Sequence, residues 1–203
     1  MERRTLLMLG IAALFVPQMP RAQDHTGLLQ QLRKGGCNIY FRHSLTIRAS
    51  QSDDDLTSCA SQRNLTEDGV ALSRQIGRHM RALQIPVGEV LASPYCRCVD
   101  TARWAFDRVA IADWLETNGD ADNPKEQARV TRLGSALNTA PAAGSNAVFV
   151  AHGNNLGGLA QLHGWPRLPI AEAEAVVFRP AGGAIPDVLA RIKGGEWAAM
   201  NRA

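Results

Sequence analysis

The chain has few aromatic residues, no internal repeat and no low-complexity tract. Aromatic residues make up 5% of its 203 residues, whereas hydrophobic residues make up 45% and charged residues 20%. This composition excludes a disordered chain and provides enough apolar material for a sizeable core. Because this length suits one well-packed domain better than two, we predict a single domain over residues 23–203.

Long hydrophobic runs are also missing. The apolar stretch Leu6–Val16 is shorter than the roughly 20 residues that a transmembrane helix needs, and no later segment is sufficiently uninterrupted. Arg3 and Arg4 precede this stretch and Ala22 follows it, which is typical of an export signal over residues 1–22. The paired arginines fit a twin-arginine route and the general secretory route alike. We therefore expect a periplasmic or secreted protein without a membrane span in its mature chain.

A strong excess of either charge is absent as well. The formal charge of +3 falls to +1 when residues 1–22 are removed, because that segment contains three arginines and one glutamate. The arginines of the remaining chain are scattered along it, so the sequence lacks the basic footprint of a nucleic-acid-binding protein. An anionic small molecule would have to be bound by a local group of cationic side chains.

Cysteine is scarce, with four residues at positions 37, 59, 96 and 98. In a chain sent to an oxidising compartment, an even number of cysteines favours disulfides. The Cys96-Arg97-Cys98 spacing lacks the second cysteine pair of a structural zinc site, so we predict no metal. We expect a disulfide between Cys59 and either Cys96 or Cys98.

Apolar runs and helical periodicities alternate along the chain. Strands are predicted at Cys37–Phe41, Val87–Ala92, Ala147–Ala151, Ala175–Phe178 and Val188–Ile192. Helices are predicted at Leu28–Arg33, Glu67–Leu83, after Ser93-Pro94, at Lys125–Leu137 and after His152. This alternation predicts an α/β fold, a three-layer α/β/α sandwich with helices on both faces of a mostly parallel central sheet.

Four basic side chains lie where predicted strands end. Arg42 and His43 follow the first strand, Arg97 opens the helix after the second, and His152 follows the third. Ligands of open α/β sheets bind beyond the carboxyl ends of the strands, so we expect these residues to converge. A nucleophilic imidazole surrounded by cationic donors suits a phosphoryl group.

Four motifs in this order carry a resemblance to a known family. They are Arg42-His43-x-x-Thr46, Arg63-x-Leu65-Thr66-x-x-Gly69, Ser93-Pro94-x-x-Arg97 with Thr101-Ala102, and Val150-Ala151-His152-Gly153. The chain from Cys37 onward resembles the histidine phosphatase superfamily, also called phosphoglycerate mutase-like, and within it the short exported bacterial members. The resemblance implies the phosphoglycerate mutase-like fold and catalysis without metal or cofactor.

The resemblance also implies roles for these residues. His43 would attack phosphorus through one ring nitrogen, with its other N–H held by a backbone carbonyl. Arg42 and Arg97 would hold the phosphoryl oxygens, and His152 would stabilise the transition state. Arg63 would bind phosphate as well or support the pocket structurally.

A leaving alkoxide also requires a proton, and two carboxylates are candidates for the donor. Glu116 lies in the region where mutase-like members carry a glutamate. Glu174 resembles part of a Gly-Glu pair of the exported members, although Ala173 replaces the glycine here. The aspartate that follows the second histidine in the acid phosphatase branch is replaced by Gly153. Of the two candidates we favour Glu174.

Together these features predict a phosphomonoester hydrolase that acts through a phosphohistidine on a small or sugar phosphate in the cell envelope. The alternative is a non-catalytic envelope protein that binds a phosphate ligand on the same fold. Substrate specificity is expected to reside in loops 44–64 and 118–123. The sequence predicts neither the substrate nor the oligomeric state.

Overall fold

The computed structural model describes residues 25–47, 55–116 and 122–202. The predicted export signal, residues 1–22, lies outside the described residues, as do parts of both loops expected to set specificity. Within the described ranges, none of the helices is long and apolar enough to cross a membrane.

A six-stranded mixed sheet forms the middle layer, with strand order β3-β2-β4-β1-β5-β6. The strands are β1 (Asn38–Arg42), β2 (Val87–Ala92), β3 (Ala110–Ile111), β4 (Asn146–Ala151), β5 (Ala175–Arg179) and β6 (Asp187–Ile192). The first four in sequence pair in parallel, whereas β5 runs antiparallel to both β1 and β6. All five predicted strands are present. The edge strand β3 was not predicted, because two exposed residues carry no recognisable pattern.

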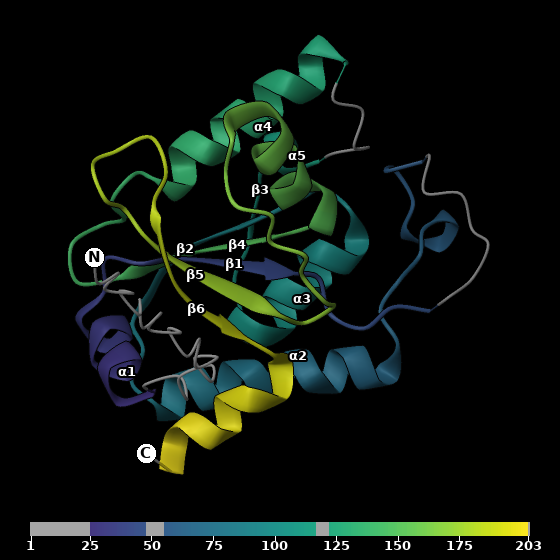
Figure 1. Cartoon of the computed structure of the whole chain (residues 1–203). Helices are drawn as coiled ribbons and strands as arrows, with labels where there is room; N and C mark the ends of the chain where they lie inside the picture. The colour runs from purple at the N-terminus through teal and green to yellow at the C-terminus, as the bar shows by residue number, and fades with distance from the viewer. Residues whose placement is uncertain (1–24, 48–54, 117–121, 203) are drawn as a thin grey trace, which may run out of the picture.

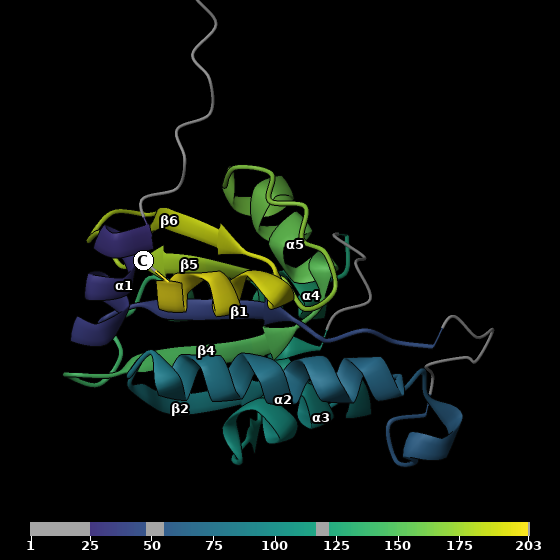
Figure 2. The same ribbon diagram turned by 90° about the horizontal axis from the view of Figure 1, so that it is seen from below.

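Helices cover both faces of this sheet. The α-helices are α1 (His25–Lys34), α2 (Glu67–Ala82), α3 (Cys96–Phe106), α4 (Pro124–Leu137) and α5 (Gly153–His163), and the 3-10 helices are η1 (Cys59–Ser61), η2 (Asp113–Leu115) and η3 (Gly194–Arg202). Figure 1 shows α4 and α5 on one face, with α1, α2, α3 and the C-terminal η3 on the other. Seen from below, η3 lies beside α2 (Figure 2). The predicted three-layer sandwich is therefore confirmed.

Two apolar cores follow from the alternation of side chains along the strands. In β1, Ile39 and Phe41 face the core beneath α1, α2 and α3, whereas Tyr40 faces the core beneath α4 and α5. In β4, Val148 and Val150 join the first core and Phe149 joins the second. Because both faces of β1 and β4 are buried, these strands have nearly continuous apolar sequences. The same central strands carry the site at their carboxyl ends.

Candidate active site

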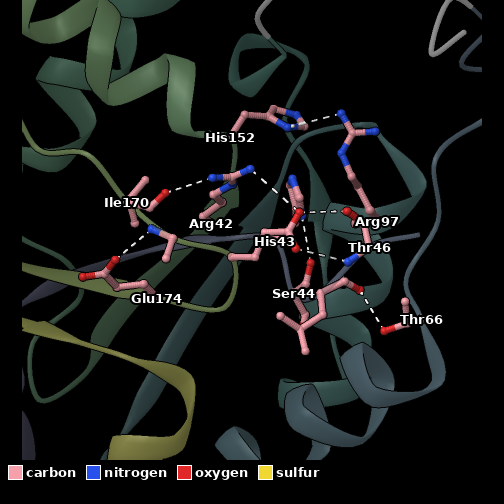
Figure 3. Close-up of polar contacts among 12 residues, drawn as sticks. Arg42, His43, Ser44, Thr46, Thr66, Arg97, His152, Ile170 and Glu174 are labelled. Atoms are coloured by element: carbon pink, nitrogen blue, oxygen red, sulfur yellow. Dashed lines mark hydrogen bonds and ion pairs between the residues drawn. The ribbon is translucent and has the colours of Figure 1, made fainter. Parts of the chain in front are cut away.

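The predicted convergence at the carboxyl ends of the strands is present. His43 follows β1, His152 follows β4, and Arg97 lies in the first turn of α3 after β2. The imidazole rings of His43 and His152 stand edge to face, with ring centroids 5.7 Å apart. Figure 3 shows both histidines with Arg42 and Arg97 around one point.

The His43 ring is held in one tautomer. Its Nδ1 atom lies 2.9 Å from the carbonyl oxygen of Ser44, and because a carbonyl only accepts, Nδ1 carries the proton. The other nitrogen, Nε2, therefore keeps its lone pair. Burial, together with the charges of Arg97 and Arg42, lowers the pKa of His43 to about 4. The ring is neutral at neutral pH, with an unprotonated nitrogen suited to nucleophilic attack.

The backbone of His43 is held from both sides. Its N–H donates to Ala151 of β4, and its carbonyl accepts from the N–H of Ala173. Ala173 adopts a φ of 61°, a left-handed conformation that costs a residue with a Cβ atom about 1–2 kcal/mol. This is the position at which the resemblance leads one to expect glycine, so the chain accepts backbone strain next to the site.

His152 is fixed by a separate set of contacts. Arg97 Nη2 lies 3.5 Å from its Nδ1 atom, and because arginine only donates, Nδ1 accepts and Nε2 carries the proton. That Nε2 lies 2.9 Å from the hydroxyl of Ser93. The buried Tyr40 hydroxyl donates to the carbonyl of His152 at 2.6 Å. Burial, followed by the charges of Arg97 and His43, lowers the pKa of His152 well below its ordinary value.

Three guanidinium groups surround the two rings. Arg97 is buried and stacks over the Tyr95 ring, 4.3 Å from its centroid. Arg42 donates through Nη1 to the carbonyl of Ile170 at 3.0 Å, while its buried Nε has no acceptor among the described residues. The charge of Arg63 also acts on His152. The pocket is therefore cationic and contains two neutral imidazoles, which suits an oxyanion.

The two carboxylates that the sequence suggested as proton donors, Glu174 and Glu116, bind other partners. Glu174 is buried, accepts from the Ala171 N–H at 2.7 Å and from Arg191 Nε at 2.9 Å. Figure 3 shows its carboxylate pointing away from His43. Glu116 pairs with Arg129 at 2.6 Å. Among the described residues, no hydrogen bond or ion pair joins either carboxylate to the histidines.

A carboxylate that sequence reasoning missed, Glu172, lies at the site instead. Thr46 donates to it from its hydroxyl at 2.8 Å and from its N–H at 3.3 Å. Arg42 Nη2 lies 3.8 Å from the same carboxylate. The charge of Glu172 acts on His43. Dashed lines leaving Arg42 and Thr46 in Figure 3 mark these contacts. The sequence does contain this second glutamate, two positions before Glu174. The direction in which each side chain points depends, however, on the turn that contains Ala173.

Other motif residues support the pocket from behind. The Thr101 hydroxyl accepts from the Ser44 N–H at 2.9 Å and donates to the Arg97 carbonyl at 2.7 Å, which ties the two loops together. The buried hydroxyl of Ser44, the residue after His43, donates to Gly69 O of α2 at 2.8 Å. A Cβ atom on Gly69 would lie 2.2 Å from the Leu45 carbonyl oxygen. This glycine therefore lets α2 approach the chain that follows His43.

A disulfide joins Cys59 to Cys96, with Cα atoms 5.7 Å apart. The sequence left the partner of Cys59 open between Cys96 and Cys98, and the structure has Cys96. Cys37 and Cys98 are buried and are not joined in a disulfide. The bond ties η1 to the first turn of α3, and the Gln62 side chain adds a hydrogen bond from the Cys96 N–H at 2.9 Å. The turn that carries Arg97 is thus anchored to the loop after β1.

Comparison with known proteins places the fold among those of the histidine phosphatases. No family model and no curated protein matches the sequence. The structure is similar to that of the protein histidine phosphatase SixA in complex with tungstate, with 15% identity and a TM-score of 0.57 over 79% of this chain and 98% of that one. At this identity the similarity shows the phosphoglycerate mutase-like fold.

Two further solved structures have the same fold. YhfR from Bacillus stearothermophilus is 15% identical, with a TM-score of 0.53 over 75% of this chain and 94% of that one. The open reading frame Rv3214 from Mycobacterium tuberculosis is 15% identical, with a TM-score of 0.51 over 75% of this chain and 95% of that one.

Proposed function

We propose that this protein is a metal-independent phosphomonoester hydrolase that acts through a phosphohistidine on a small or sugar phosphate in the cell envelope. The observation that carries the proposal is His43, a neutral imidazole whose Nδ1 proton is bound to the Ser44 carbonyl. Its free nitrogen lies in a pocket of arginines. A site that only binds phosphate has no need of an unprotonated imidazole in that position.

The surrounding residues fit the parts of a phosphoryl transfer. His43 Nε2 attacks phosphorus, and the planar guanidinium groups of Arg42 and Arg97 hold the phosphoryl oxygens. His152 stabilises the transition state, and Arg63 adds positive charge. Water then attacks the phosphohistidine and releases inorganic phosphate. The tungstate in the SixA structure is an oxyanion of the same general shape as the group transferred here.

The proposed location is the periplasm or the medium. The Cys59–Cys96 disulfide supports it, because such bonds form and persist in oxidising compartments. The apolar segment behind Arg3 and Arg4 supports it from the sequence. A small-molecule phosphomonoester outside the cytoplasm is therefore the proposed substrate.

The test is hydrolysis of an aryl phosphate by the purified protein, with and without a chelator. We expect chelator-resistant release of phosphate that disappears in His43→Ala and persists in His163→Ala, which changes an exposed histidine of α5. A radiolabelled phosphoryl group should remain on the wild-type protein after rapid quenching and be absent from His43→Ala. A wild-type protein that binds phosphate but hydrolyses neither an aryl phosphate nor a panel of sugar phosphates would instead be the non-catalytic binding protein.

A further inference from the structure

The proposed reaction needs a group that gives the leaving oxygen a proton, and the carboxylate of Glu172 lies at the site. Both oxygens of its carboxylate are held by Thr46, and Arg42 lies at 3.8 Å on another side. A quarter of the side chain, 25%, remains exposed, so the carboxylate is oriented and still accessible to a bound molecule. Of the carboxylates described, it is the one whose charge acts on His43.

The charge on Glu172 follows from these neighbours. Burial alone would raise the pKa of this carboxyl, but the hydrogen bonds from Thr46 and the neighbouring His43 and Arg42 side chains outweigh burial and lower it. The site therefore holds one carboxylate among the three guanidinium groups of Arg42, Arg63 and Arg97. Such a site carries two net positive charges, which attract an anionic phosphomonoester.

We propose, on the premise of the phosphohistidine reaction above, that Glu172 is the general acid and base of this site. It donates a proton to the oxygen of the leaving alcohol in the first half-reaction and removes one from water in the second. Glu174 and Glu116 remain in their ion pairs with Arg191 and Arg129 throughout.

The proton enters with the substrate. A phosphomonoester monoanion has a second pKa of about 6. Once it is bound, the arginines lower the pKa of the phosphate and its negative charge raises the pKa of the Glu172 carboxyl beside it, so the proton passes from the phosphate to Glu172. The Nε2 lone pair of His43 then forms the N–P bond while the P–O bond to the alcohol breaks, and the proton of Glu172 goes to the departing oxygen. The alcohol leaves, and Glu172 is again a carboxylate.

The second half-reaction returns that proton. Water attacks phosphorus, one of its protons passes to Glu172, and the N–P bond breaks with its electron pair returning to His43 Nε2. Inorganic phosphate departs as the monoanion after taking the proton from Glu172. Atoms and charge balance over the cycle without a metal ion or any other co-reactant.

The test compares esters whose alcohols need a proton to different degrees. Initial rates are measured with dinitrophenyl phosphate, phenyl phosphate and glycerol phosphate for the wild type and for Glu172→Gln. Dinitrophenolate leaves without a proton, whereas phenolate and alkoxide require one. We expect Glu172→Gln to lower the rate of the phosphorylation step about 10²–10⁴-fold for phenyl and glycerol phosphate, and less than about tenfold for dinitrophenyl phosphate.

A second measurement tests whether Glu172 acts as the general base toward water. In Glu172→Gln, dinitrophenol should be released in a burst equal to the amount of protein, followed by slow turnover, because water is no longer activated. Glu89→Gln, which changes an exposed carboxylate of β2, should behave like the wild type. Glu174→Gln and Glu116→Gln test the rival donors, and a loss confined to the poor leaving groups in either of them would overturn the assignment to Glu172.

Failure of this inference differs from failure of the proposed function. If the wild type cleaves all three esters and Glu172→Gln lowers their rates equally, Glu172 only positions Arg42 and the inference is wrong. If the wild type cleaves none, or His43→Ala remains active, both are wrong. Should thermal unfolding show that Glu172→Gln is not folded, Glu172→Ala replaces it, and added formate should restore phenyl phosphate hydrolysis. Lack of that rescue would overturn the inference.

Discussion

The neutral state of His43 makes stability depend on pH in a specific direction. Its pKa is about 4 in the folded protein against an ordinary value of 6.5, so between these values the unfolded chain binds a proton that the folded protein does not. Stability therefore rises with pH across this window. The contribution of His43 to stability is fully present above the pKa of the unfolded chain and is lost as the pH falls toward the pKa of the folded protein.

The size of the effect follows from the same two values. Lowering the pH from about 7 to about 5 should reduce the free energy of unfolding by about 2 kcal/mol through His43 alone, and by about 3 kcal/mol once the pH is below both pKa values. His152, whose pKa is also lowered by burial and by Arg97, adds a loss in the same direction. The two neutral rings thus make the protein less stable in acid.

Urea unfolding of the wild type, His43→Asn and His163→Asn at both pH values measures this effect. We expect His43→Asn to lose about 2 kcal/mol less than the wild type on acidification. His163→Asn, a change at an exposed position of α5, should keep the wild-type pH dependence. An identical pH dependence in the wild type and His43→Asn would refute the conclusion that the fold holds this ring neutral.

Three further variants and one control substitution test how the pocket is supported. Gly69→Ala should destabilise the protein by about 1–3 kcal/mol in urea unfolding, because its Cβ would lie 2.2 Å from the Leu45 oxygen. Gly157→Ala, in open space on α5, should be neutral or stabilising by up to about 1 kcal/mol. Tyr40→Phe should cost about 1–3 kcal/mol, because it leaves the buried His152 carbonyl without its donor; a thermal midpoint equal to that of the wild type would contradict this. Replacing Cys59 and Cys96 by serine opens a bond between residues 37 apart and should cost about 2–4 kcal/mol. A reducing agent should destabilise the wild type similarly and leave the double variant unchanged.

Most of the fold could be predicted because its elements have strong local patterns. The buried central strands are apolar throughout, and α2 begins at an N-cap, Thr66, whose hydroxyl accepts from the Gly69 N–H. The short edge strand β3 could not be predicted, since its two residues are defined by pairing with β2 and not by their own sequence. The sequence also left the partner of Cys59 open between two cysteines on the same helix turn.

The site was predictable where residues follow strands and less so where they lie in turns. His43 and His152 directly follow parallel neighbours of one sheet, so strand ends alone bring them together. Glu172 and Glu174 are two positions apart in an irregular turn, and the left-handed backbone at Ala173 separates their directions. No periodicity governs such a turn, so the sequence could not show which of the two glutamates faces His43. The sequence prediction favoured Glu174, which binds Arg191.

The contact between Ala173 and His43 has a consequence for how the protein is made. The ribosome releases the chain from its N-terminus, so His43 and Arg42 emerge well before the hairpin of β5 and β6. Until that hairpin is synthesised, the His43 carbonyl lacks its donor and the Arg42 N–H lacks the Glu174 carbonyl that it binds at 3.1 Å. A nascent chain that has not yet reached residue 174 carries the nucleophile without these two hydrogen bonds, so the assembled pocket depends on residues more than 120 positions further along the chain.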